Sequence, residues 1–336
     1  MIENVLKQAE RGEDLSMEVM SSAIDAIMQG QWDEESIERL LVALHRKGET
    51  VAEIAGAAAA MRRQMTPIRT RHTVFLDVVG TGGDGSGTFN ISTAAALVTA
   101  AAGVPVAKHG NRRFTSRSGS ADVLAALGVN IEAAVPRVEK CLDELGLCFC
   151  FAPLLHQAMR HVGPVRRRIS HPTVFNLLGP LSNPAGAPYQ LLGVGRPVLR
   201  PMLAEALALL GTQRSLVVHG EDGLDEVTLG ARTFALEMTP DETRDWTFSP
   251  ADFGLTEVPL NDLCVDGPEE SAAMIRGILE GHRGPARDIV VANGAAALWT
   301  VRYRDTLLEC AAAAAEAIDS GAARDLLANL VVETNR

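Results

Sequence analysis

The 336-residue sequence is poor in aromatic residues and cysteine, and it has no long apolar run. Its five cysteines match no disulfide or zinc spacing, so we expect all of them to be buried, reduced and inert. They are Cys141, Cys148, Cys150, Cys264 and Cys310. No apolar stretch reaches the ~20 residues of a membrane-spanning helix, and the mixed-charge beginning of the sequence lacks the apolar core of a secretion signal. We therefore expect a cytoplasmic protein without a membrane partner.

Basic residues are fewer than acidic ones. The sequence has 31 Lys and Arg and 42 Asp and Glu, which gives a formal charge of −11. This balance argues against general binding to nucleic acid or to anionic membranes, since both need basic surfaces. The hydrophobic share of 47% and the charged share of 22% are ordinary for a globular protein and exclude a disordered one. The length is sufficient for about two domains.

Acidic residues are missing from two long stretches, residues 85–121 and 145–204, which nevertheless contain basic residues. Local basic islands in an acidic chain favour an anionic ligand. For the second stretch, an apolar core with a few basic residues at its surface explains the pattern equally well. The basic residues in question are Lys108, Arg112, Arg113, Arg117, Arg160, Arg166, Arg167, Arg168, Arg196 and Arg200.

The beginning of the chain has the pattern of a helical domain. Apolar residues recur at helical spacing within residues 17–28 and 37–44. Thr50 and Glu53 form a capping box at the start of a third helix. We therefore expect the first ~65 residues to be entirely helical.

After this region, strands and helices are expected to alternate. Predicted strands cover residues 74–79, 104–107, 216–219 and 289–292, and predicted helices cover residues 94–102 and 121–127. Such alternation is typical of a mostly parallel sheet covered on both faces. The expected fold class is α/β, with a small all-helical N-terminal domain and a larger α/β domain with a mostly parallel central sheet. We place the helical domain at residues 1–68, joined by a returning segment around 163–185, and the α/β domain at residues 70–336.

A glycine-rich loop at residues 80–85, GTGGDG, follows the first predicted strand. It fits GxGxxG, but the acid that dinucleotide-binding sites place about 20 residues later is absent. Ser86 also stands where a P-loop needs lysine. Exposed loop amides, the nearby hydroxyls and a helix N-terminus together favour phosphate. Taken alone, the loop is also compatible with a structural role, as a tight turn followed by an ordinary helix cap.

Two further segments are expected near this loop. Residues 108–120 follow the next predicted strand, and the carboxyl ends of parallel strands lie at one edge of a sheet. Asp225 and Glu226 follow another predicted strand, and adjacent carboxylates suit Mg²⁺, which prefers hard oxygen ligands and phosphate co-ligands. Without phosphate loops beside it, this acidic pair would be read as a solvated turn.

Six motifs together make the chain similar to a known family. They are GTGGDG at 80–85, NIST at 90–93, KHGNR at 108–112, SGSADVL at 118–124, FNLLGPLSNP at 175–184 and LDE at 224–226. In these motifs, and along nearly its whole length, the chain resembles the anthranilate phosphoribosyltransferases. The resemblance implies that anthranilate attacks C1 of phosphoribosyl pyrophosphate (PRPP), that pyrophosphate leaves, and that the product enters tryptophan synthesis. It also implies a Mg²⁺ cofactor and a homodimer joined through the helical domains.

The resemblance assigns roles to particular residues and implies no protein nucleophile. It places anthranilate at Gly80, Asn111 and Arg166, and Mg²⁺ at Ser92, Asp225 and Glu226. It places PRPP at Gly80, Gly83, Asp84, Thr88, Asn90, Ile91, Ser92, Thr93, Lys108, His109, Gly110, Asn111, Arg112, Arg113, Phe114, Thr115, Ser116 and Ser120.

The chemistry of this transfer agrees with the residues present. Departure of pyrophosphate develops charge on the ribose and on the leaving oxygens, which Mg²⁺ and Lys108 can stabilise. Arg166 can form a bidentate pair with the carboxylate of the acceptor. For His109 we favour a structural hydrogen-bonding role over a catalytic one.

The chain departs from the family pattern mainly around the expected acceptor site, so a related aromatic acceptor is an alternative. The departures are Leu155 and Gln157 beside His156, Arg168 in place of an acid, Pro172 in place of arginine, and Arg113 and Phe114 in place of small residues. A pyrimidine-nucleoside phosphorylase and a noncatalytic nucleic-acid-binding paralogue are further alternatives. The KHGNR motif argues against the first, and the metal pair and the net charge argue against the second.

Overall fold

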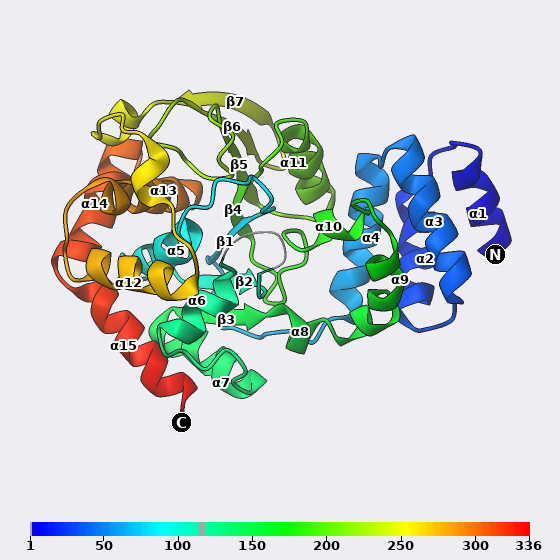
Figure 1. Ribbon diagram of the computed structural model, residues 1–336, viewed down its shortest axis with the longest axis horizontal. Coiled ribbons are helices and arrows are strands. Elements are labelled where there is room, and N and C mark those ends of the chain that lie inside the picture. The colour runs from blue at the N-terminus through cyan, green and yellow to red at the C-terminus, as the bar shows by residue number, and fades with distance from the viewer. Residues whose placement is uncertain (1, 114–117) are drawn as a thin grey trace.

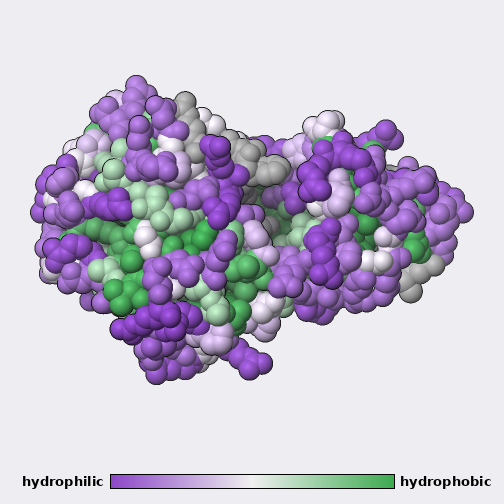
Figure 2. Space-filling model, turned by 60° about the horizontal axis from the view of Figure 1, so that its bottom comes forward, coloured by the Kyte–Doolittle hydropathy of each residue, from purple (hydrophilic) through white to green (hydrophobic). Residues whose placement is uncertain are grey.

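The computed structural model describes residues 2–113 and 118–336, which form two lobes of unequal size (Figure 1). The N-terminal helices make up most of the smaller lobe, and the sheet with its covering helices makes up the larger one. Figure 2 shows the same two lobes from below, with apolar residues gathered on part of the surface of the larger lobe. Among the described residues, no helix is long and apolar enough to cross a membrane.

The smaller lobe combines the start of the chain with a segment that returns to it. Helix α9 packs against α3, and α10 packs against α4. One apolar core includes residues from both segments, Leu40 and Ile54 from the first and Val165 and Phe175 from the second. The elements are α1 (Ile2–Glu10), α2 (Met17–Met28), α3 (Glu34–Lys47), α4 (Val51–Gln64), the 3₁₀ helix η2 (Gln157–His161), α9 (Gly163–Arg168) and α10 (Phe175–Leu178). The short helix α8 (Ala152–Leu155) leads into the returning segment, and its Leu155 packs in the core of the larger lobe.

The larger lobe is built on a seven-stranded sheet within the described residues, in the order β3-β2-β1-β4-β5-β6-β7. The first five strands of the chain run parallel, and β6 and β7 continue the sheet antiparallel. The strands are β1 (Leu76–Gly80), β2 (Val106–Gly110), β3 (Leu147–Phe151), β4 (Tyr189–Gly193), β5 (Arg214–Gly220), β6 (Thr233–Met238) and β7 (Thr243–Phe248). The predicted fold class, with its mostly parallel sheet, is confirmed.

The strand order reverses beside β1, because β2 and β3 lie on one side of it and β4 to β7 lie on the other. In open α/β sheets, ligands bind outside the carboxyl ends of the strands at such a switch point. Gly80 and Gly193 are register partners at the carboxyl ends of β1 and β4. The topology therefore indicates a site next to these two glycines.

Helices cover both faces of the sheet. Helices α5 and α13 pack on one face, and α11 packs on the other and also contacts α4 of the smaller lobe. The remaining elements complete the larger lobe. The covering elements are α5 (Ile91–Ala101), α6 (Ser120–Ala126), α7 (Val135–Lys140), the π-helix η1 (Cys141–Leu145), α11 (Leu199–Leu209), the 3₁₀ helices η3 (Pro250–Phe253) and η4 (Leu260–Leu263), α12 (Pro268–Leu279), α13 (Pro285–Thr300), α14 (Leu307–Asp319) and α15 (Ala322–Thr334).

Neighbouring residues of the central strands belong to different apolar cores. Leu191 and Leu216 pack in the core of the larger lobe, whereas Leu192 and Val217 pack in the core that is shared with the smaller lobe. This division follows from the alternation of side chains along a strand. The sheet therefore connects the two lobes through one of its faces.

Three sequence expectations need correction. The strand predicted at residues 289–292 is part of α13, because a short apolar run has the same pattern in a buried helix as in a buried strand. The strand predicted at 104–107 is β2, which starts two residues later and continues through Lys108 and His109. Cys264 is exposed in the connection between η4 and α12, whereas the other four cysteines are buried, and all five are free.

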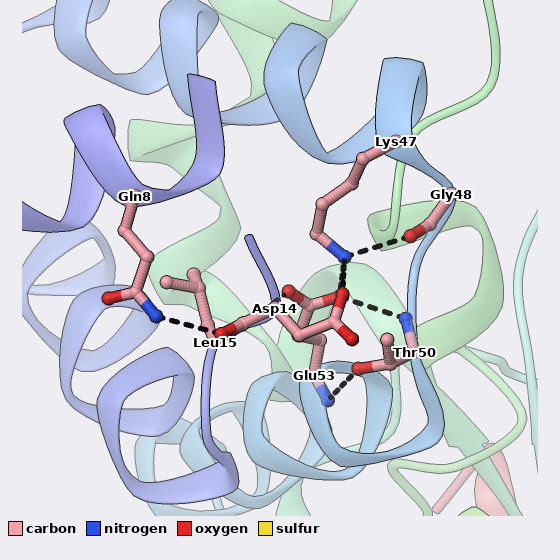
Figure 3. Close-up of polar contacts among 7 residues, drawn as sticks. All are labelled: Gln8, Asp14, Leu15, Lys47, Gly48, Thr50 and Glu53. Atoms are coloured by element: carbon pink, nitrogen blue, oxygen red, sulfur yellow. Dashed lines mark hydrogen bonds and ion pairs between the residues drawn. The ribbon is translucent and has the colours of Figure 1, made fainter. Parts of the chain in front are cut away.

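A buried ion cluster holds the smaller lobe together (Figure 3). The Nζ atom of Lys47 lies 2.8 Å from Glu53 Oε2 and 2.9 Å from Asp14 Oδ1. Glu53 is fully buried, and its carboxylate also accepts hydrogen bonds from the amides of Leu15 and Thr50 at 2.9 and 2.8 Å. The side chain of Thr50 completes the predicted capping box at the start of α4. One carboxylate therefore joins the α1–α2 loop, α3 and α4.

We expect the Glu53→Ala substitution to lower the free energy of unfolding by about 3–5 kcal/mol, because it leaves the buried ammonium of Lys47 without its buried partner. Asp14→Ala is the matched control, since this partner of Lys47 is 68% exposed and its loss should cost about 1 kcal/mol or less. Urea denaturation monitored by circular dichroism measures both values. Equal losses for the two variants would contradict the central role of Glu53.

Candidate active site

Four sequence motifs meet at the carboxyl ends of the parallel strands. The amide of Gly82 donates a hydrogen bond to Asp225 Oδ2 at 2.8 Å, and the amide of Ser92 donates one to Glu226 Oε1 at 3.1 Å. Lys108 in the middle of β2 donates to Ser92 Oγ at 3.2 Å. These contacts join the glycine-rich loop, the start of α5, the KHGNR motif and the acidic pair. The structure therefore brings together the predicted phosphate loops and the predicted metal pair.

Two glycines make room for the acidic pair. A Cβ atom at Gly80 would lie 2.6 Å from Asp225 Oδ2, and a Cβ atom at Gly193 would lie 1.6 Å from the backbone oxygen of Asp225. No side chain fits at either position unless this loop moves. Gly193 was not predicted as a site residue, because its role depends on pairing with Gly80 across the sheet, which the sequence does not display.

The glycine-rich loop exposes backbone amides. Gly82, Gly83, Gly85 and Gly87 have φ angles between 66° and 77°, in the left-handed region that side chains disfavour. Successive amides in such a loop form a concave anion-binding surface. The loop runs directly into α5, whose free N-terminal amides also favour an anion.

The far end of this loop is anchored by three elements of the larger lobe. The amide of Phe89 donates to Leu263 O at 2.8 Å, and the amide of Val265 donates to Gly87 O at 2.9 Å. Asn90 exchanges hydrogen bonds with the hydroxyl of Ser271, which belongs to α12. Thr88 and Asp84 lie within this anchored loop, and Ile91 and Thr93 are buried in the first turn of α5.

The acidic pair is half-buried and electrostatically strained. Burial, and next the charge of Asp84, raise the pKa of Asp225 to about 7. Burial, and next the charge of Asp225, raise the pKa of Glu226 well above its ordinary value. Among the described residues, no group of three or more His, Cys, Asp or Glu side chains has an arrangement that could hold a metal ion. A metal ion at this pair would therefore need further ligands, such as hydroxyl or phosphate oxygens.

Lys108 provides the positive charge beside these acids. It is 4% exposed, and its Nζ atom donates to the backbone oxygen of Val78 at 2.7 Å. Burial lowers the pKa of Lys108, and the charges of Asp77, Glu226 and Asp225 oppose this effect. The ammonium is therefore held by Val78 and Ser92, and the nearby carboxylates favour its charged form.

Asp77 is a site residue that sequence reasoning missed. It is fully buried in β1, burial raises its pKa to about 6, and its Oδ1 atom accepts a hydrogen bond from the amide of His109 at 3.2 Å. The available signal was a single acid inside an otherwise apolar predicted strand. Its charge partner lies on the neighbouring strand, 31 positions away in sequence, which hid the pairing.

His109 is held by hydrogen bonds within the protein. Its Nδ1 atom lies 3.2 Å from Gly179 O, and its Nε2 atom lies 3.2 Å from His156 Nε2. Burial, with His156 next, lowers the pKa of His109 to about 3, and burial lowers that of His156 to about 4. Both rings are therefore neutral at pH 7. This geometry agrees with the structural role favoured for His109.

The remaining residues of the KHGNR region lie beside the start of α6. Ser120 packs against Gly110, and its hydroxyl reaches Asn111 O at 3.5 Å. The guanidinium of Arg112 pairs with Asp122 at 3.4 Å, and the amide of Arg113 donates to the same carboxylate at 2.8 Å. The predicted contacts of Phe114, Thr115 and Ser116 lie outside the described residues.

Arg166 belongs to the returning segment rather than to the sheet edge. Burial lowers the pKa of its guanidinium, which lies over the ring of Phe175 with 5.8 Å between Cζ and the ring centroid. No carboxylate of the described residues forms an ion pair with Arg166. Its charge is therefore available for a ligand, although no hydrogen bond within the described chain links it to Gly80 or Asn111.

Comparisons with known proteins agree with this geometry. Residues 3–65 match the glycosyl transferase family helical bundle domain, and residues 72–324 match the glycosyl transferase family a/b domain. An anthranilate phosphoribosyltransferase of Rhodopirellula baltica is 53% identical over 327 residues, which cover 97% of this chain and 96% of the relative. The chain belongs to the anthranilate phosphoribosyltransferase family.

Solved structures of this family have the same fold. The anthranilate phosphoribosyltransferase of Thermus thermophilus aligns with a TM-score of 0.93 and 45% identity, covering 99% of both chains. The enzyme of Saccharomyces cerevisiae in complex with PRPP and Mg aligns with a TM-score of 0.91 and 30% identity, covering 99% of this chain and 98% of that one.

The structure shows the contacts or burial of three residues that depart from the family pattern. Arg168, which replaces an acid, pairs with Glu34 and Glu38 of α3, so the returning helix is attached to the smaller lobe by charge. Gln157 is exposed, and its side-chain amide donates a hydrogen bond to the backbone oxygen of Leu154. Leu155 is buried at the end of α8.

The raised pKa of Asp225 generates a pH dependence of stability. The pKa of Asp225 is 3.8 in the unfolded chain and about 7 in the folded protein, so between these pH values the carboxyl ionises mainly in the unfolded chain. Its contribution to the free energy of unfolding is therefore fully present below pH ~4 and is lost as the pH rises toward 7. We expect the Asp225→Asn variant to gain stability relative to the parent protein between pH ~4 and ~7. Urea denaturation in a chelating buffer measures the difference. A difference that stays constant across this range would contradict the burial argument.

Proposed function

We propose that this chain transfers the phosphoribosyl group from PRPP to anthranilate, giving phosphoribosylanthranilate and pyrophosphate in tryptophan biosynthesis. The observation that carries the proposal is the set of hydrogen bonds that joins the glycine-rich loop, the start of α5 and the acidic pair at the switch point of the sheet. Membership of the anthranilate phosphoribosyltransferase family supports it.

The donor would bind across the phosphate loops. The amides of the glycine-rich loop and of the α5 N-terminus offer hydrogen bonds to phosphate oxygens. Thr88, Ser92 and Thr93 add hydroxyls on the same stretch of chain. The described site residues proposed for the donor are Gly80, Gly83, Asp84, Thr88, Asn90, Ile91, Ser92, Thr93, Lys108, His109, Gly110, Asn111, Arg112, Arg113 and Ser120.

Mg²⁺ fits the acidic pair. Asp225 and Glu226 are half-buried, and their pKa values are raised by burial and by neighbouring negative charge, an unfavourable arrangement that a divalent cation offsets. We propose Asp225, Glu226 and the hydroxyl of Ser92 as its protein ligands. The bound ion supplies positive charge to phosphate oxygens. The solved yeast relative in complex with PRPP and Mg supports this assignment.

The protein's own residues would supply positioning and charge. As the bond between C1 and the pyrophosphate oxygen breaks, positive charge develops on the ribose and negative charge on the leaving group. The buried ammonium of Lys108 acts in a low-dielectric site, where a fixed charge stabilises the leaving group strongly. The amino group of anthranilate attacks C1 directly and then loses a proton. Orientation of the two substrates therefore contributes much of the rate.

The acceptor would lie between the sheet edge and the returning segment. We propose that Arg166 holds the carboxylate of anthranilate and that Gly80 and Asn111 contact the same molecule. The absence of an acidic partner for Arg166 among the described residues supports this role. The replacements at Gln157 and Arg168 keep a related aromatic acceptor as the alternative. Loss of anthranilate fluorescence on addition of PRPP and Mg²⁺ decides between the two.

We also propose a cytoplasmic homodimer joined through the helical domains. In this proposal, residues 1–68 and the segment around 163–185 form the helical domain, and residues 70–336 form the α/β domain. The apolar core shared by α4 and the returning helices supports the division. The match of residues 3–65 to the family's helical bundle domain also supports the division. Light scattering coupled to size-exclusion chromatography tests the assembly.

We expect the double substitution Asp225→Asn and Glu226→Gln to lower turnover by about 10²–10³-fold, because the charge that organises the leaving group is lost. Circular dichroism should show an unchanged fold. Glu221→Gln is the matched control, since this acid lies in the same loop but is paired with Arg232 at the surface. Full activity of the double variant at low Mg²⁺ would refute the metal assignment.

We expect the Arg166→Ala substitution to raise the KM for anthranilate by about 10–100-fold, because a charge-assisted bidentate pair is lost. The KM for PRPP should change far less. Arg167→Ala removes the next guanidinium of α9, which is exposed, and provides the control. A larger change in the KM for PRPP than for anthranilate would count against the carboxylate role.

A further inference from the structure

A cavity of about 250 Å³ lies in the larger lobe between α12 and the start of α13. Its lining contains none of the residues proposed above for PRPP, Mg²⁺ or anthranilate. Met274 and Ile278 provide an apolar wall, and Asp262, Arg283 and Arg287 provide charge. The volume lies below the ~300–1,000 Å³ of clefts for drug-sized ligands, so it suits a smaller molecule.

The positive side of this cavity has capacity for an anion. Arg287 is only 5% exposed, and its Nε atom has no hydrogen-bond partner among the described residues. Arg287 and Arg283 share one carboxylate, that of Asp319, at 3.0 and 3.1 Å. The N-cap residue of α13, Gly284, offers no side-chain hydrogen bond to the free amides of the first turn. Free amides at a helix N-terminus are satisfied by a ligand oxygen.

The charges of the lining favour a zwitterion over a polyanion. Asp262 lines the cavity, and Asp288 and Asp319 pair with Arg287 at 3.8 and 3.0 Å. This region therefore has three carboxylates and the two guanidinium groups of Arg283 and Arg287. A phosphate ester would add several negative charges to this region, whereas a molecule with one carboxylate and one ammonium adds none. We propose that this cavity binds a small apolar α-amino acid. Its carboxylate lies toward Arg283 and the α13 N-terminus, its ammonium toward Asp262, and its side chain on Met274 and Ile278.

The walls of the cavity are the elements that anchor the phosphate loops. Leu263, next to Asp262, accepts a hydrogen bond from the amide of Phe89 at 2.8 Å. Ser271 of α12 is bonded to Asn90 at 2.9 Å. Asn293 of α13 exchanges hydrogen bonds with the backbone of Val227, directly after the acidic pair, at 2.9 and 2.8 Å. An amino acid in the cavity would therefore stabilise the arrangement of the loops at the sheet edge.

Isothermal titration calorimetry with the full-length protein tests the binding, and it requires no catalytic activity. The probes are the apolar amino acids from L-valine to L-tryptophan, and we expect at least one of them to bind. For L-leucine, two analogues remove one charge each, namely L-leucinamide and 4-methylpentanoate. For a zwitterion site, each analogue should bind at least ~10-fold more weakly than the amino acid. No binding by any of the probes at millimolar concentration, or equal binding of the analogues, would overturn the proposal.

Three variants locate the binding in this cavity. Met274→Trp fills the apolar wall and should abolish binding, and Arg283→Gln and Asp262→Asn should each weaken it by about 10-fold. None of these residues belongs to the proposed catalytic machinery, so the circular dichroism spectrum and turnover should be unchanged. Val332→Trp, at an exposed apolar position of α15, is the control for an added indole. Undiminished binding by Met274→Trp would place the amino acid elsewhere and refute the site.

Hydrogen exchange measures the link between the cavity and the loops. The amides of residues 87–90 should exchange more slowly when the amino acid is bound, because the acceptor of the Phe89 amide lies in the segment that lines the cavity. The Met274→Trp variant should show no such change. Unaltered exchange with saturating amino acid would overturn the coupling, while the calorimetry would stand as a separate measurement of binding.

Discussion

The site depends on carboxylates that are half-buried at the sheet edge and held there by backbone amides. Asp225 and Glu226 accept hydrogen bonds from Gly82 and Ser92, and the buried ammonium of Lys108 lies beside them. Burial disfavours ionised carboxylates, and their mutual repulsion adds to the effect. The glycines at the ends of β1 and β4 follow from this arrangement, because the acidic loop occupies the space that their side chains would need. An otherwise ordinary α/β sheet thus carries one strongly perturbed polar centre, and such centres are typical of functional sites.

Much of this arrangement could be predicted from the sequence, because it depends on local patterns. The capping box at Thr50, the glycine-rich loop before α5 and the mostly parallel sheet are all present in the structure. Motifs that follow parallel strands converge for a topological reason, so the meeting of the loops at one edge needed no knowledge of side-chain positions. The resemblance to the anthranilate phosphoribosyltransferases added the substrates and the individual residue roles.

The failures have a common physical origin in tertiary contacts. The run at residues 289–292 became helical because α13 is buried on nearly all sides, which removes the alternation that distinguishes the two structures. Asp77, His156 and Gly193 owe their roles to partners on other strands or loops, and such pairings leave no local signal. The exposure of Cys264 likewise depends on where the connection between η4 and α12 lies in the fold.

The assignment of adjacent residues to separate cores makes the central strands intolerant of a shift in alignment. Leu191 and Leu192 face opposite ways, one into the core of the larger lobe and the other toward the helical bundle. A one-residue insertion within β4 would exchange these directions and misplace Gly193 relative to the acidic loop. Evolutionary change in chain length is therefore expected in the surface connections of this fold, whereas β4 itself should retain its residue count.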